Sequence, residues 1–168
     1  MIIFDDCDIE KALFWAVAGI TAGTGQVCAA TSRIFIQDTI KDGFLATLKE
    51  RFEAIPLGQD PQDVSSFFGP VVDKSQYDRV TGYIQAGKKG GTKTLTKTGG
   101  DYTGKGYYVA PTIFVDPDDD AAIYREEIFG PVLCAKTFTS EEDAIRMAND
   151  TSYGLSGQHL NSDALWSC

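Results

Sequence analysis

The chain has 168 residues, enough for one domain or most of one. Hydrophobic residues make up 43% and charged residues 23%, close to the average of globular proteins. The formal net charge is −9 and no large cluster of Lys or Arg reverses it locally, which excludes a nucleic-acid or anionic-membrane partner. No apolar run approaches the ~18 residues that a transmembrane helix needs.

The four cysteines are scattered at Cys7, Cys28, Cys134 and Cys168, without C-x-x-C spacing and without a signal peptide ahead of them. Reduced thiols in an intracellular compartment are the simplest interpretation. We therefore expect a cytoplasmic protein. The chain begins like the interior of a protein, so a lost targeting segment, and with it a mitochondrial location, stays open.

The first half of the chain alternates strand-like and helix-like patterns. Apolar residues at helical spacing follow a short buried strand, and a β-branched, aromatic strand precedes a second helix. In chain order we predict a strand at 2–4, a helix with apolar residues from Ile9 to Ile20, a strand at 32–37, a second helix and a loop at 56–70. Asp5 or Asp6 would cap the first helix and Asp38 the second. The apolar face of the second helix would consist of Ile40, Phe44, Leu48, Phe52 and Ile55.

The second half continues the alternation after a polar, glycine-rich interruption at 87–106. Asp73 and Gln76 resemble a capping box that opens a helix with Tyr77, Val80 and Ile84 on one face. We then predict a short strand at 92–96, extended chain at 107–115, a strand at 132–138, a helix at 141–148 capped by Ser140, and a strand at 155–160. Such alternation predicts one α/β unit with a mostly parallel sheet flanked by helices.

Cys28 stands in a setting that suits a nucleophile. Glycines at 23 and 25 let the backbone turn sharply and approach a substrate closely. A cysteine that leaves such a turn can present its sulfur and its own N–H to the same space, as a thiolate nucleophile with a backbone oxyanion donor requires. From this pattern alone a buried, inert thiol is the commoner outcome, and we expect that outcome for Cys7, Cys134 and Cys168.

Five ordered motifs resemble those of the aldehyde dehydrogenases. The sequence G-Q-V-C at 25–28 with Ser32-Arg33 matches the family's active-site signature, and E-I-F-G-P-V at 127–132 matches a second motif without a break. The other three are F-G-P-V-V at 68–72, G-Y-Y-V-A-P-T at 106–112 and A-N-D-T-S-Y-G-L-S at 148–156. Because their order and gaps are also family-like, the set is far more specific than any single motif.

The resemblance implies an oxidoreductase that converts an aldehyde substrate to a carboxylic acid with NAD or NADP. Cys28 would attack the carbonyl to give a thiohemiacetal, which becomes a thioester, while its own N–H helps to hold the oxyanion. Glu127 would accept hydrogen bonds from the ribose hydroxyls of the cofactor, Phe129 would pack near the nicotinamide, and Gln76 would lie near the cofactor. Without the resemblance, Glu127 reads as a surface carboxylate and Phe129 as a core aromatic.

The resemblance also sets expectations about completeness. Residues 1–157 would form a partial catalytic domain, and residues 158–168, which include the lone His159, would form a divergent tail without a catalytic role. The cofactor-binding and oligomerisation domains would be absent, as would the general-base glutamate and the second oxyanion donor, an asparagine. The parent enzyme would be a homo-oligomer.

Two functional hypotheses therefore stand side by side. The chain is part of an aldehyde dehydrogenase that acts through Cys28, or it is a catalytically incompetent fragment that only associates with itself or with full-length subunits. A remnant thiol esterase and a structural role are further alternatives, which nothing in the sequence favours.

The segment 116–127 imitates a calcium-binding loop. Acidic residues occupy loop positions 1, 3 and 5, and Glu127 occupies position 12. Position 6, however, is Ala121 where the sharp turn needs glycine, and the flanks read as strands rather than helices. We expect an exposed turn and the start of a helix, and no metal site.

Overall fold

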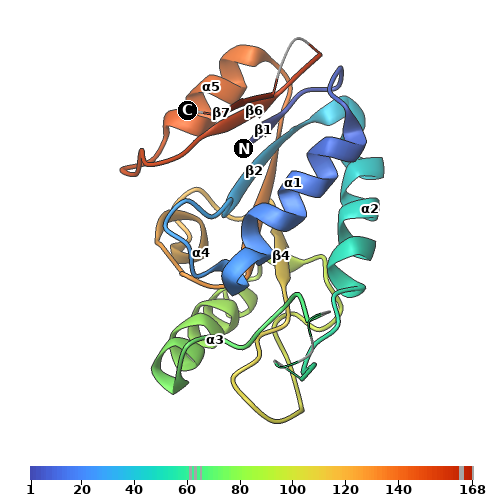
Figure 1. The fold of residues 1–168 in the computed structure, drawn as a ribbon. Helices are drawn as coiled ribbons and strands as arrows, with labels where there is room; N and C mark the ends of the chain where they lie inside the picture. Colours follow the sequence, from blue (N-terminus) through green and yellow to red (C-terminus); the bar gives the residue numbers. More distant parts are fainter. Residues whose placement is uncertain (61, 63, 65, 163–164, 168) are drawn as a thin grey trace.

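One mixed sheet runs through the part of the chain that the computed structural model describes, namely residues 1–60, 62, 64 and 66–162, with the backbone of 165–167 (Figure 1). Its strands lie in the order β3-β4-β5-β2-β1-β6-β7. The bounds are β1 Ile2–Ile3, β2 Arg33–Gln37, β3 Lys93–Thr94, β4 Thr112–Val115, β5 Val132–Phe138, β6 Gln158–Leu160 and β7 Leu165–Ser167.

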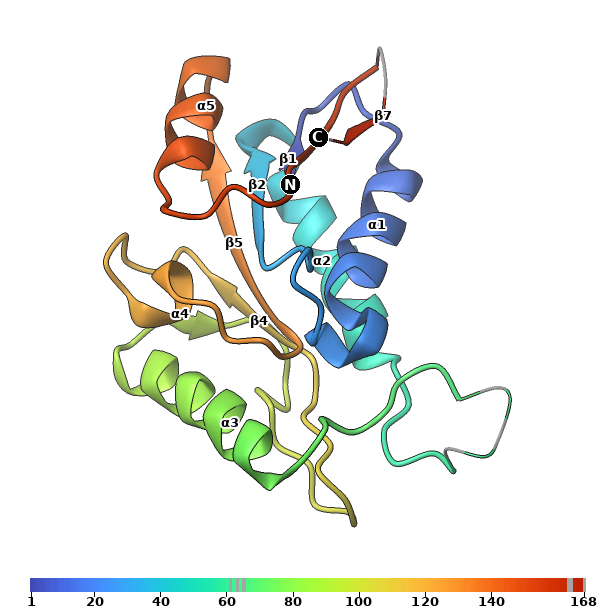
Figure 2. The same cartoon turned by 60° about the vertical axis from the view of Figure 1, so that its left-hand side comes forward.

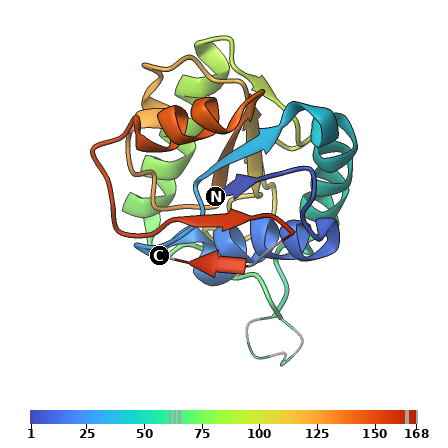
Figure 3. The same ribbon diagram turned by 90° about the horizontal axis from the view of Figure 1, so that it is seen from above.

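The central strands are parallel and only the two edge strands are antiparallel. β4, β5, β2, β1 and β6 run in one direction, whereas β3 pairs antiparallel with β4 and β7 with β6. The predicted α/β class with a mostly parallel sheet is thus confirmed. β1 pairs with β6, and Ile2 lies opposite His159 (Figure 3). β6 belongs to the segment 158–168, which we expected to be a divergent tail, so part of that segment is a strand of the sheet.

Helices cover both faces of the sheet (Figure 2). α1 and α2 lie on one face, and α3, α4 and α5 on the other. Their bounds are α1 Ile9–Thr21, α2 Lys41–Glu53, α3 Lys74–Lys89, α4 Ala122–Arg125 and α5 Glu141–Asn149, with 3₁₀ turns at Ala22–Gly25 and Asp38–Ile40. Among the described residues, every helix is too short or too polar to cross a bilayer.

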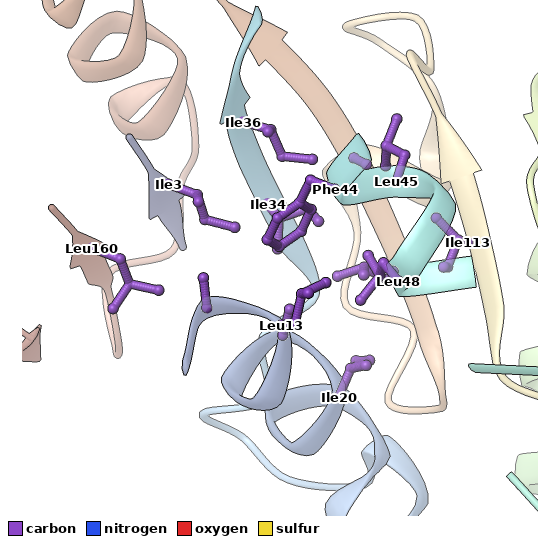
Figure 4. Packing of buried hydrophobic residues seen from close by; sticks show 14 of the residues in the cluster. Ile3, Leu13, Ile20, Ile34, Ile36, Phe44, Leu45, Leu48, Ile113 and Leu160 are labelled. Atoms are coloured by element: carbon purple, nitrogen blue, oxygen red, sulfur yellow. The ribbon is translucent and has the colours of Figure 1, made fainter. Parts of the chain in front are cut away.

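Alternation along the strands sends side chains into two separate cores. Ile34 and Ile36 of β2 face α1 and α2, where they pack with Leu13 and Leu48 (Figure 4). Phe35, which lies between them in sequence, packs in the cluster on the other face. This period of two is what a sheet buried on both faces requires. The sheet is therefore rigidly sandwiched, and the loops at its ends are held by a packed scaffold.

Two of the predicted helix caps are wrong. α1 is capped by Asp8, whose Oδ1 accepts from the Lys11 N–H at 3.1 Å, and not by Asp5 or Asp6. Three acidic residues precede this helix, and the one adjacent to its first turn takes the cap. Asp38 does not cap α2 either, because it begins a 3₁₀ turn that leads into that helix.

The other two caps are confirmed. Ser140 Oγ accepts from the Asp143 N–H at the start of α5, and Asp73 Oδ1 accepts from the Gln76 N–H at 2.8 Å at the start of α3. In a complete capping box the Gln76 side chain would also bind the Asp73 N–H, but this second contact does not form. The Gln76 side chain points instead to the loop before β5, which becomes important for the site.

Candidate functional site

The cysteine turn begins where α1 ends and has an unusual backbone. Three consecutive residues, Gly23, Thr24 and Gly25, have positive φ angles of 57°, 58° and 71°. The chain then makes a second turn in which the Ala30 N–H donates to the Val27 carbonyl at 3.0 Å, and Cys28 is exposed at its tip. In the described part of the chain no acceptor takes up the Cys28 N–H, so this donor is available to a ligand.

Gly25 brings the cysteine turn into contact with the loop at 127–131. A Cβ atom at Gly25 would lie 2.2 Å from the carbonyl oxygen of Gly130 and 2.8 Å from the nitrogen of Pro131. Only glycine permits this approach, because it lacks the Cβ and tolerates the positive φ. The glycine of the first motif therefore touches the glycine and proline of the second.

Two side chains of the same turn hold the segment 68–72. Thr24 Oγ1 donates to the Gly69 carbonyl at 3.0 Å, and Gln26 Oε1 accepts from the Val72 N–H at 2.9 Å. Gln26 also closes its own turn, since its Nε2 donates to the Gly23 carbonyl. Three of the five sequence motifs thus meet around Cys28.

The loop at 127–131 precedes β5 and carries a strained residue. Phe129 has φ of 61°, a left-handed conformation that costs a non-glycine residue about 1–2 kcal/mol. The carbonyl of Phe129 accepts from Gln76 Nε2 at 2.6 Å, and that of Glu127 accepts from Arg79 Nη2 at 2.6 Å. Side chains of α3 therefore stabilise the loop in this conformation.

Two tyrosines complete the surroundings of this loop. The Tyr83 hydroxyl donates to Glu126 Oε2 at 2.5 Å, and this bond raises the pKa of Tyr83. On the other side, the Tyr153 hydroxyl accepts from the Glu127 N–H at 3.3 Å. Tyr153 belongs to the motif at 148–156, so a fourth motif reaches the site.

The structure brings the predicted site residues to one end of the sheet, where two interior strands begin. Cys28 lies before β2 and Glu127 and Phe129 lie before β5, its direct neighbour, while Gln76 contacts the Phe129 backbone from α3. Glu127 is exposed and Phe129 is half-buried, so Phe129 is not a residue of either core. The site lies at the amino ends of the parallel strands, whereas open α/β sheets bind ligands more commonly at the carboxyl ends.

Sequence reasoning missed Thr24, Arg79 and Tyr153. Arg79 follows Gln76 by three residues and so lies on the same helical face, which is a usable signal. Tyr153 lies inside the motif at 148–156, but the motif alone predicts no contact for its hydroxyl. Nothing local to Thr24 indicates its contact with Gly69.

The other cysteines differ from Cys28 in exposure. Cys134 is buried in β5, where desolvation raises its pKa to about 12, and its thiol contacts the Ile123 carbonyl at 3.3 Å. Cys7 is buried near the start of α1, and desolvation raises its pKa as well. The expected packing role is confirmed for both, and Cys168 lies outside the described residues.

The segment 116–127 forms a turn followed by the short helix α4. Its flanks are the strands β4 and β5, as expected from the sequence, and Asp119 pairs with Lys136 of β5. Arg125 of α4 binds the Asp150 carboxylate at 2.7 Å. Within the described residues, no group of three or more His, Cys, Asp or Glu side chains is arranged to hold a metal ion.

A profile of the aldehyde dehydrogenase family matches residues 1–164. The chain belongs to this family. It is 45% identical to the betaine aldehyde dehydrogenase of Sinorhizobium fredii over 97% of its length, and 44% identical to that of Agrobacterium fabrum over the same share. It covers 34% and 33% of those two proteins, so it spans about a third of the length of the curated relatives it matches.

Solved structures of the family have the same fold. The NAD⁺ complex of an aldehyde dehydrogenase from Bacillus cereus superimposes with a TM-score of 0.91 at 38% identity, over 96% of this chain and 33% of that one. A betaine aldehyde dehydrogenase from Staphylococcus aureus in complex with NAD⁺ gives 0.91 at 36% identity, over 96% and 32%. The expected membership of the family is thereby confirmed.

Proposed function

We propose that this chain is the nucleophile-bearing part of an enzyme that oxidises aldehydes to carboxylic acids with NAD⁺ or NADP⁺. The observation that carries the proposal is the meeting of the cysteine turn with the loop at 127–131 through Gly25 and Gly130. Family membership and the NAD⁺ complexes of two similar proteins support it.

Cys28 supplies the covalent chemistry in this proposal. Its thiolate sulfur attacks the aldehyde carbon, and the carbonyl π electrons move to the oxygen, which takes a hydrogen bond from the Cys28 N–H. Loss of a hydride from the resulting thiohemiacetal leaves a thioester on Cys28. Water then cleaves the carbon–sulfur bond, releasing the carboxylic acid and the thiol. The general base and the second oxyanion donor are not assigned to residues of this chain.

The residues beside Cys28 fit a nicotinamide cofactor. When bound, NAD⁺ or NADP⁺ accepts the hydride. Glu127 presents an exposed carboxylate, which can only accept hydrogen bonds when ionised and therefore suits ribose hydroxyls. Phe129 is half-buried, so part of its side chain is accessible for packing, and Gln76 Nε2 donates to its backbone carbonyl at 2.6 Å. We propose Glu127, Phe129 and Gln76 as the cofactor side of the site.

The test is NADH formation from an aldehyde by the full-length protein, meaning the longer enzyme of which we propose this chain to be a part, and by its Cys28→Ser variant. Betaine aldehyde is the first substrate to try, because several relatives carry that name. We expect a loss of at least about 1,000-fold in kcat, since the nucleophile is removed. Cys7→Ala is the matched control and should retain activity. Intact turnover in Cys28→Ser would refute the proposal.

We also propose that the 168-residue chain alone is not a dehydrogenase and at most associates with itself or with longer subunits. The observation behind this proposal is that it spans about a third of its relatives. Purified chain should form no NADH from an aldehyde and NAD⁺, although Cys28 should still react with iodoacetamide. Cofactor-dependent NADH formation by this chain alone would refute the second proposal and strengthen the first.

A further inference from the structure

Helix α3 presents one row of polar side chains to three consecutive carbonyl groups. Arg79 Nη2 donates to the Glu127 carbonyl at 2.6 Å, and Gln76 Nε2 donates to the Phe129 carbonyl at 2.6 Å. Both side chains approach the Ile128 carbonyl between them, each at 3.4 Å. Every carbonyl of 127–129 therefore faces a donor from the same helix.

The spacing on α3 makes this arrangement possible. Gln76, Arg79, Val80 and Tyr83 lie three and four residues apart, which places them on one face of the helix. Val80 packs so closely on the loop that a Cβ at Gly130 would lie 2.5 Å from its Cγ2. Tyr83 lies under the Arg79 guanidinium at 5.1 Å and restricts its direction. Apolar packing and polar contacts thus act on the same loop.

The contacts hold the backbone of Glu127 and leave its carboxylate open. The Glu127 carbonyl is bound by Arg79 and the Glu127 N–H by Tyr153. Across the described residues, no hydrogen bond or ion pair engages the Glu127 carboxylate. Because the backbone of Glu127 is already ordered in the folded protein, a ligand that binds its free acceptor oxygens has only the side chain left to order.

We propose that Gln76 and Arg79 are positioning residues that clamp the 127–129 backbone and thereby direct the Glu127 carboxylate and the Phe129 ring toward the cofactor. Gln76 then acts through the loop, which refines its assignment near the cofactor, and Arg79 becomes a functional residue. This inference rests on the proposed function, because the clamp matters for activity only if the loop binds a nicotinamide cofactor.

The first experiment measures the clamp without any turnover. Amide hydrogen exchange is followed by mass spectrometry in the 168-residue chain and in Arg79→Met, Gln76→Met and the double variant. We expect the peptide that covers 126–133 to exchange about tenfold faster in each single variant, while peptides from α1 and β2 are unchanged. Lys74→Met is the matched control on the same helix, because the partner of Lys74 among the described residues is the exposed Asp78 and not the loop.

The second experiment measures the consequence in the full-length protein. Arg79→Met should raise the KM for NAD⁺ about tenfold while kcat falls less than threefold, and Arg79→Lys should recover part of that loss because it restores one charged donor. Lys74→Met should leave both parameters unchanged. A general folding defect would lower the active fraction and kcat together, so the two causes are separable.

The outcomes separate the clamp from the proposed function. Unchanged exchange at 126–133 in the double variant would overturn the inference, and so would faster exchange with an unchanged KM for NAD⁺. If Arg79→Met does not fold, Arg79→Lys and Gln76→Glu give the same two readouts. Turnover that survives in Cys28→Ser overturns the proposed function, and the exchange data alone then decide whether α3 holds the loop.

Discussion

The two ends of the parallel sheet are stabilised in different ways. At the carboxyl ends of the strands, α1 and α5 begin at local caps, in which Asp8 and Ser140 accept from N–H groups three residues away. At the amino ends, the cysteine turn and the 127–131 loop depend on contacts between segments far apart in sequence, such as Gly25 with Gly130 and Gln76 with Phe129.

The difference shows where the fold accepts strain. Among the described residues, three non-glycine residues have positive φ: Thr24 and Phe129 lie at the amino ends of the strands, and Asp116 directly follows β4 at its carboxyl end. A strained backbone conformation persists only where many surrounding contacts hold it in place, and such residues cluster at functional sites. At the carboxyl ends, local bonds hold the starts of α1 and α5, whereas at the amino ends contacts between distant segments hold two residues in a strained conformation.

The largest expected effect concerns thiol reactivity at the amino end. Iodoacetamide should label Cys28 at least about 100-fold faster than Cys7 or Cys134, because buried thiols react only after opening of the fold and Cys28 is exposed. Peptide mass spectrometry measures each rate. In urea the three rates should converge, and similar rates in the folded protein would mean that the turn does not form as described.

Gly25→Ala should give the largest loss of stability at the amino end. The new Cβ meets the Gly130 carbonyl at 2.2 Å and requires a positive φ, so we expect the free energy of unfolding to fall by about 2–4 kcal/mol. Urea unfolding measures it. Gly43→Ala on α2 is the matched control, because its Cβ meets nothing within 4 Å, and it should stabilise by about 0.5–1 kcal/mol. Equal effects at both glycines would contradict the close approach.

Ser140→Ala tests the carboxyl end. Loss of the α5 cap should lower the free energy of unfolding by about 1 kcal/mol, because one orphan N–H loses its partner. Labelling of Cys28 should not change, since the cap lies at the other end of the sheet. A stability loss accompanied by altered Cys28 reactivity would show that the two ends are coupled.

The smallest effects concern pH, and they should have opposite signs at the two ends. The backbone hydrogen bond from Lys11 lowers the pKa of Asp8, so its contribution to stability is present above the ordinary value of 3.8 and is lost as pH falls below it. The bond to Glu126 raises the pKa of Tyr83, so its contribution is present below 10 and is lost as pH rises above it. Thermal unfolding of Asp8→Asn should be less acid-sensitive and that of Tyr83→Phe less alkali-sensitive. If the melting temperature of each variant varied with pH as that of the unchanged protein does, neither Asp8 nor Tyr83 would be responsible for the pH dependence.

The same contrast explains how far the sequence predicts this protein. β5 was predicted to the residue and the Ser140 cap correctly, because periodicity and capping are local signals. The cap of α1 was misplaced among Asp5, Asp6 and Asp8 because all three residues carry the same acceptor. The partner of the Gln76 side chain could not be predicted. The capping-box pattern points to the nearby Asp73 N–H, whereas the side chain binds the carbonyl of Phe129, more than fifty residues away.

The site residues Cys28, Glu127, Phe129 and Gln76 came from the resemblance of motifs, and the structure adds the contacts between those motifs. Local chemistry alone favoured an inert Cys28 and a core Phe129. Arg79 and Tyr153 bind the backbone of Glu127. Helical spacing places Arg79 on the same face of α3 as Gln76, but nothing in a single sequence identifies the distant carbonyl or N–H group that each side chain binds.

The contact of Gly25 with Gly130 also bears on how the protein is made. Until residue 130 has been synthesised, the cysteine turn lacks the backbone of Gly130, against which Gly25 packs in the folded protein. Closing so long a loop is entropically costly and slow compared with forming α1 or α2. During synthesis Cys28 is therefore made before the loop that shapes its turn, and the turn can reach its final geometry only after residue 130 has been added and β5 can pair with β2.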